Sequence, residues 1–114
     1  MIPINPNLLK DTCDRIEKKF DMSVYKPFQS GDAGCIAYNI CLAAGADVNG
    51  IQYNEIPHIA RDIWAARYGK EEADRLEFDE KGWGDNISEV TPEEAIAHLR
   101  GANPVVHSTY PDDS

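Results

Sequence analysis

The residue best suited to covalent chemistry is Cys35, which follows Gly-Asp-Ala-Gly at residues 31–34 and opens an apolar run. If a helix starts there, its positive end would lower the thiol pKa and prepare a nucleophile. His107 could act as the base, with Asp112 or Asp113 orienting its ring. Only seven residues follow His107, too few for the strands that cysteine hydrolases place after such a helix. We therefore interpret Cys35 as a small apolar packing residue, and a Cys35-dependent hydrolase or transferase with His107 as base is the alternative.

Residues that could bind a metal are sparse in this sequence. His58 and Asp62 lie four apart on an expected helix, but a catalytic zinc usually has three protein ligands. We interpret His58 as a surface residue in the first turn of that helix. The acidic segment 79–89 departs from the calcium-loop pattern, because Lys81 and Trp83 occupy positions that need oxygen ligands. The sequence predicts neither a metal nor a cofactor.

Charge is the most uneven property of the chain. Its 114 residues carry a formal net charge of −9. Residues 1–30 hold five cations and four carboxylates, whereas residues 71–94 hold two cations and ten carboxylates, a net of −8. Contact with phosphate requires lysine and arginine, so we expect no direct binding to nucleic acid or to anionic membranes.

The acidic segment around Trp83 is the best candidate for a binding surface. Clustered carboxylates can imitate a row of phosphates, and an exposed tryptophan rimmed by acids would anchor a basic partner. A charged face that only keeps the protein soluble is the alternative interpretation. The predicted partner-binding residues are Glu71, Glu72, Asp74, Asp79, Glu80, Trp83, Asp85 and Glu89.

The elements that would position these residues are short helices. Apolar spacing predicts helices at residues 7–20, 34–44, 57–68 and 70–78, then a loop around Trp83. A fifth helix should follow Thr91, where Pro92 and Glu94 complete a capping box, and end at Gly101. We expect an all-α, single compact domain of four to five short helices over residues 1–104. Residues 105–114 should form a mobile acidic tail, with one possible short strand at residues 104–108.

Four segments carry a resemblance to known sequences: GDAGCIAYNICLAAG, IARDIWA, EEADRLEF and TPEEAIAHL. Together they resemble a group of small uncharacterised proteins from bacterial and phage genomes, over about residues 31–100. The chain departs from that group at Tyr38, where the group has glycine, and at Glu77 before Phe78. The resemblance implies a helical fold and a prokaryotic or viral origin, and it carries no activity.

These observations favour a non-enzymatic protein that binds a basic surface of another protein. By analogy with small acidic phage proteins, the partner would be host machinery that binds nucleic acid, such as a CRISPR or restriction system. The three cysteines, Cys13, Cys35 and Cys41, form no disulfide framework, and no leader of basic then apolar residues precedes them. We therefore expect a cytoplasmic protein, in the host cytoplasm if phage-encoded. A scaffold domain or homodimer is a third hypothesis.

Overall fold

A computed structural model describes residues 5–29 and 32–108, and it confirms the all-α fold class. Within those ranges every helix is too short or too polar to span a lipid bilayer. The helices are α1 (Leu8–Lys18), α2 (Ile36–Ala43), α3 (Ile56–Tyr68), α4 (Lys70–Arg75), α5 (Glu80–Trp83) and α6 (Pro92–Leu99), with 3₁₀ turns η1 (Tyr53–Glu55) and η2 (Ile87–Glu89).

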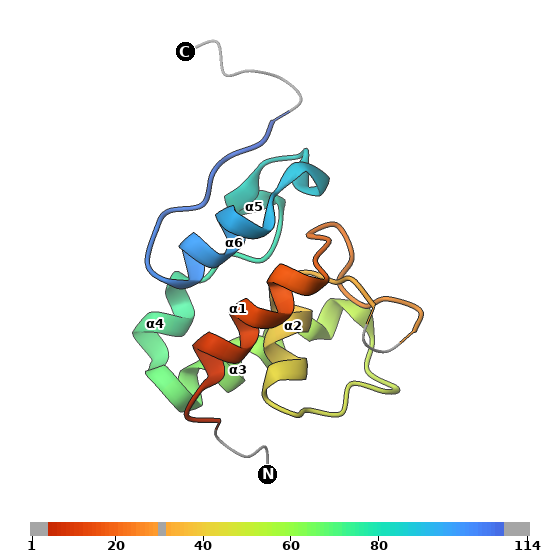
Figure 1. Cartoon of the computed structure of the whole chain (residues 1–114), viewed down its shortest axis with the longest axis vertical. Coiled ribbons are helices and arrows are strands. Elements are labelled where there is room, and N and C mark those ends of the chain that lie inside the picture. The colour runs from red at the N-terminus through yellow and green to blue at the C-terminus, as the bar shows by residue number, and fades with distance from the viewer. Residues whose placement is uncertain (1–4, 30–31, 109–114) are drawn as a thin grey trace.

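Helix α2 lies at the centre of the domain, between α1 and α3 (Figure 1). Its sequence is apolar on nearly every side, and all residues from Ile36 to Cys41 are buried. Within this stretch the Asn39 amide donates hydrogen bonds to the carbonyls of Gly34 and Cys35 at 3.0 and 2.9 Å. A helix that is hydrophobic all round is stable only when it is enclosed, which explains the central position of α2.

Two predicted helices end earlier than their apolar spacing indicates. Helix α1 ends at Lys18 because Lys19 is extended and Phe20 forms an isolated bridge with Gly34. Helix α4 ends at Arg75, and Leu76 is again extended. In both cases the next apolar side chain reaches the core from an extended backbone.

The C-terminal part of the described chain contains helices α4, α5 and α6 (Figure 1). Helix α6 begins as predicted: Thr91 accepts a hydrogen bond from the Glu94 N–H, and Glu94 accepts one from the Thr91 N–H. It packs against α1 through its buried face, which carries Ala95, His98 and Leu99. The possible short strand at residues 104–108 does not form in the described residues, where the backbone hydrogen bonds of this segment are those of His107 with Trp83 and Asn86.

Thr12 on α1 is fully buried, and its hydroxyl has no hydrogen-bond partner among the described residues. Burial of an unpaired hydroxyl is costly, so replacing Thr12 by isosteric valine should raise the free energy of unfolding by about 1 kcal/mol. Urea denaturation measures the change. Thr91→Val is the matched control: its hydroxyl caps α6, so the same substitution should lower stability by about 1 kcal/mol. A loss of stability in Thr12→Val would contradict the assignment.

Candidate interaction surface

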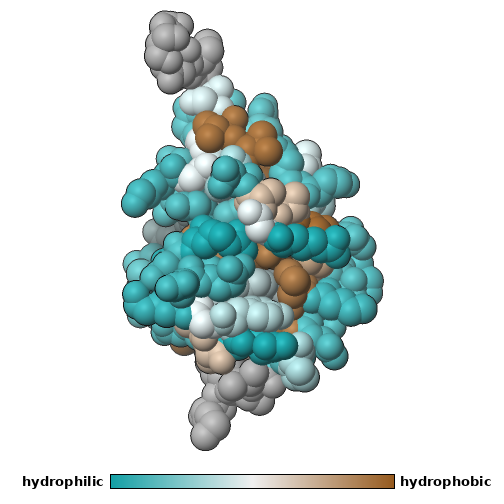
Figure 2. All heavy atoms as spheres, turned by 90° about the vertical axis from the view of Figure 1, so that its left-hand side faces the viewer, coloured by the Kyte–Doolittle hydropathy of each residue, from teal (hydrophilic) through white to brown (hydrophobic). Residues whose placement is uncertain are grey.

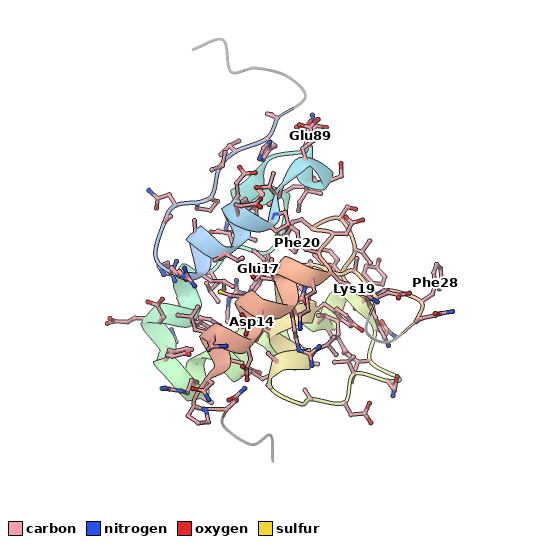
Figure 3. The ribbon with its side chains drawn as sticks, viewed as in Figure 1. Asp14, Glu17, Lys19, Phe20, Phe28 and Glu89 are labelled. Carbon is pink, nitrogen blue, oxygen red and sulfur yellow. The ribbon has the colours of Figure 1, made fainter. Side chains whose placement is uncertain are left out.

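The acidic segment places most of its carboxylates at the surface, in and around α4, α5 and η2. We call this part of the molecule the acidic surface, and it consists of Glu71, Glu72, Asp74, Asp79, Glu80, Asp85 and Glu89. Six of these side chains are exposed, and Glu72 is half-buried. Figure 3 shows Glu89 at the end of the molecule that is formed by α5 and α6. The structure therefore keeps these predicted charges at the surface.

Part of this charge is neutralised by neighbours on the same helix. Asp74 pairs with Lys70 at 2.9 Å, and Glu72 pairs with Arg75 at 2.5 Å. The hydrogen bond from Arg75 lowers the pKa of Glu72 below its ordinary value. Glu71 and Glu80 form no ion pair within the described residues. These two carboxylates keep their full charge for an approaching cation.

Trp83, predicted as an exposed anchor, is fully buried, and that prediction is wrong. Asp79 caps the short helix α5 by accepting a hydrogen bond from the Lys81 N–H, and the helical turn directs the indole into the core. There the indole N–H donates to the carbonyl of Glu77 at 2.8 Å. Its ring lies edge-on to His98 at a centroid distance of 5.2 Å. Trp83 supports the acidic surface from beneath and cannot contact a partner.

His98 is the centre of a buried polar network that the sequence did not reveal. Its Nε2 accepts a hydrogen bond from the Glu77 N–H at 3.1 Å, and its Nδ1 lies 2.8 Å from the Ala102 carbonyl. This arrangement requires the neutral ring with the proton on Nδ1. Burial lowers the pKa of His98 below its ordinary value of 6.5, which favours that neutral ring. Arg75 joins the network by donating to the His98 carbonyl at 2.6 Å.

His107 lies beyond the predicted domain boundary at residue 104, yet it is hydrogen-bonded to the domain. Its N–H donates to the Trp83 carbonyl at 2.7 Å, and its carbonyl accepts from the Asn86 N–H at 2.9 Å. Its imidazole Nε2 lies 2.8 Å from a Glu94 carboxylate oxygen. Burial alone would raise the pKa of Glu94, but hydrogen bonds from Thr91 and His107 outweigh it and lower that pKa.

Gly84 makes this contact possible. A Cβ atom at that position would lie 2.0 Å from the His107 carbonyl oxygen, and its φ of +88° is one that other residues rarely adopt. The sequence showed Gly84 only as a residue flanking Trp83. Asp112 and Asp113, the predicted orienting acids, lie outside the described residues.

Cys35 caps the N-terminus of α2, close to the predicted helix start, but its thiol has the opposite character from a nucleophile. The side chain is fully buried, and its sulfur accepts a hydrogen bond from the Tyr38 N–H at 3.5 Å. Burial raises the pKa of Cys35 to about 12, so the expected lowering by the helix end is wrong. His107 is not among the groups that shift the pKa of Cys35, and Cys35 is not among the hydrogen-bond partners of His107. The structure therefore does not bring the predicted nucleophile and base together.

His58 lies exposed in the first turn of α3, which confirms its interpretation as a surface residue. Asp62 follows one turn later and is also exposed. Throughout residues 5–29 and 32–108, no group of three histidine, cysteine or carboxylate side chains could hold a metal ion. Cys13, Cys35 and Cys41 are buried and form no disulfide.

Two adjacent hollows are lined in part by residues of the acidic surface. One, of about 440 Å³, lies between α3 and α4, and its walls include Asp74, Glu77 and Asp79 together with His58. The other, of about 350 Å³, has Asp79 and Glu80 in its wall. Tyr25 lines both hollows, and burial raises its pKa to about 12. Lys81 also lines both hollows and Arg61 lines the larger one, so a side chain that enters meets carboxylates, an aromatic ring and these cations.

Comparisons with protein-family models, with curated proteins and with solved structures found no match to this chain. The resemblance of residues 31–100 to small bacterial and phage proteins stays a prediction.

Proposed function

We propose that this protein binds a basic surface of another protein through its acidic surface. The observation that supports the proposal is the charge of residues 71–94, which hold ten carboxylates and two cations and include the exposed acids of α4, α5 and η2. Lys70, which begins α4 just before this segment, pairs with Asp74. Of the two cations within the segment, Arg75 already serves the buried network around His98. The net field of the segment is therefore strongly negative, which attracts and orients a positively charged partner.

Tyr25 takes over the role that the sequence assigned to Trp83. Its ring lines both hollows next to Asp79, so an arginine or lysine that enters could contact an aromatic face and a carboxylate together. Such cation–π contacts contribute about 0.5 to 2 kcal/mol, more when water is excluded. Because the hollows can receive a side chain, this geometry favours a partner whose arginine or lysine side chains project from its surface over a partner whose basic surface is flat.

Proteins that bind nucleic acid carry basic surfaces of this type, because they contact phosphates with arginine and lysine. We infer that the partner belongs to this class, and that this protein acts as an inhibitor by occupying the surface that nucleic acid would use. A prokaryotic nuclease system, such as a CRISPR or restriction system, is the specific form of the proposal. Its carboxylates would then compete directly with phosphate groups.

The proposal predicts that reversing charge on the acidic surface abolishes binding. The test variant is Glu71→Lys/Glu80→Lys/Glu89→Lys, which leaves Glu72 in place because its partner Arg75 holds the buried network. Immobilised wild-type protein should capture a basic partner from a lysate of the native host, and the variant should capture at least about ten times less. Quantitative mass spectrometry of the captured proteins measures the ratio.

The matched control changes the same amount of charge elsewhere. Glu17, Glu55 and Asp62 are exposed on α1, η1 and α3, and Figure 3 shows Glu17 on α1, away from Glu89. Glu17→Lys/Glu55→Lys/Asp62→Lys should capture the same partner as wild type. Equal losses in both variants would mean that only net charge matters, and undiminished capture by the acidic-surface variant would overturn the proposal.

A further inference from the structure

The largest exposed apolar side chains outside η1 lie at two separate ends of the described structure. Phe28 is fully exposed, and Figure 3 shows it projecting from the loop that follows α1. Val105 and Val106 are 49% and 66% exposed, and Figure 2 shows apolar atoms gathered next to the grey C-terminal residues. Exposure of a phenylalanine side chain forgoes about 1.5 to 3 kcal/mol of burial energy, so these positions call for an explanation.

Phe28 forms one wall of an open groove of about 710 Å³ at the C-terminal end of α1. The floor and walls are mainly apolar, whereas the rim carries positive charge. The groove is lined by Phe20, Val24, Pro27, Phe28 and Ala33, with Lys18, Lys19, Lys26 and Asp32 around them. We call it the Phe28 groove.

The positive charge at this groove is largely available to a ligand. Lys18 is exposed and forms no ion pair within the described residues. Lys19 lies 3.7 Å from Asp32, with both side chains more than half exposed, so this pair is weak. Only Lys26 is committed to the fold, because its ammonium group donates to the Ile51 carbonyl. The Phe28 groove therefore suits an apolar segment bordered by carboxylates.

The same chain carries such a segment at its other end. Val105 and Val106 precede His107, which hydrogen bonds to Trp83 and Asn86 hold against the domain. The imidazole of His107 lies beside the carboxylates of Glu94 and Glu89, at 2.8 and 3.8 Å. The hydrogen bonds of the adjacent His107 restrain the two valines next to negative charge, which lowers the entropy that docking would cost.

We propose that Val105 and Val106 of one copy of this chain dock into the Phe28 groove of a second copy. The two surfaces are complementary in charge as well as in hydropathy. Figure 1 shows the chain just before the grey C-terminal trace at the top of the molecule, and Figure 3 shows Phe28 at its right-hand side, so each molecule can use both surfaces at once. The contact is therefore heterologous and joins copies head to tail. The small apolar area makes the association weak, with dimers and short oligomers forming at high protein concentration.

Sedimentation velocity over a concentration series tests the proposal. Wild-type protein should show concentration-dependent association that weakens at high salt. Phe28→Ser and Val105→Ser/Val106→Ser should each weaken it by about ten- to a hundredfold, from the apolar burial that each removes. Because these side chains are exposed, neither change should unfold the domain, and circular dichroism checks this. Tyr53→Ser is the matched control, since Tyr53 is 64% exposed but does not line the Phe28 groove.

Mixing the two variants gives the decisive result. Phe28→Ser keeps an intact valine segment, and Val105→Ser/Val106→Ser keeps an intact groove, so the mixture should form a heterodimer and stop there. Wild-type protein that stays monomeric at about millimolar concentration, where weak interfaces associate, would overturn the proposal. It would also be overturned if association survived in both single variants, or if the mixture stayed monomeric. Both variants retain Glu71 and Glu80, so capture of a basic partner is measured independently.

Discussion

Replacing Trp83 by alanine is expected to lower the free energy of unfolding by about 3 to 5 kcal/mol. The indole is fully buried, packs edge-on against His98 and donates a hydrogen bond to the Glu77 carbonyl. Its removal leaves a cavity beneath the acidic surface and an unpaired carbonyl. Urea denaturation monitored by circular dichroism measures the change. Domains of this size have a total stability of about 5 to 15 kcal/mol, so the variant should be close to unfolding.

Trp64 supplies a matched comparison for the hydrogen bond alone. It is as deeply buried as Trp83, but its indole N–H has no partner among the described residues. Trp83→Phe should therefore cost about 1 kcal/mol more than Trp64→Phe, because only the first breaks a hydrogen bond. If Trp83→Ala cost less than 1 kcal/mol and reduced partner capture instead, the exposed anchor expected from the sequence would be correct.

The second large effect concerns His98 and its pH dependence. Replacing His98 by alanine should lower the free energy of unfolding at pH 7 by about 2 to 4 kcal/mol, because the Glu77 N–H and the Ala102 carbonyl lose their partner. Burial lowers the pKa of His98 below its ordinary 6.5, so below pH 6.5 the unfolded chain binds a proton that the folded chain excludes. Stability is therefore full above pH 6.5 and falls as the pH decreases toward the folded-state pKa of His98.

The measurement is the free energy of unfolding between pH 7 and pH 5, which lies above the range where most carboxylates titrate. For a single proton the slope is at most about 1.4 kcal/mol per pH unit. His98→Gln, which cannot be protonated, should show a flatter profile than wild type. His58→Gln removes an exposed histidine from α3 and should keep the wild-type profile. Parallel profiles for wild type and His98→Gln would contradict the buried neutral ring.

Local signals in the sequence were sufficient for much of the fold. The capping box at Thr91 and Glu94 depends on residues three apart, and the burial of α2 follows from its continuous apolar composition. Helix ends were less predictable. Lys19 and Leu76 are extended, and Phe20 and Phe78 pack against the core from outside the two helices. These are long-range contacts that the local sequence does not encode.

The candidate site shows the same division between local and long-range information. The placement of carboxylates at the surface follows from their composition, since charged groups are rarely buried without a partner. The burial of Trp83 depends on its contact with His98, fifteen positions later. It also depends on the helical turn α5, which the sequence indicated as a loop because glycines flank Trp83 on both sides. One signal did exist for His98: with Ala95 and Leu99 it occupies positions of one helical face, and that face is buried.

The most direct test of the central claim is the affinity for the captured basic partner at low and at high ionic strength. Raising salt from about 0.1 M to 1 M shortens the screening length from about 10 Å to 3 Å. Binding through the acidic surface predicts that wild type loses at least about tenfold in affinity over this range, while Glu71→Lys/Glu80→Lys/Glu89→Lys binds weakly at both. Wild-type affinity that is independent of salt and equal to that of the variant would contradict the proposed function.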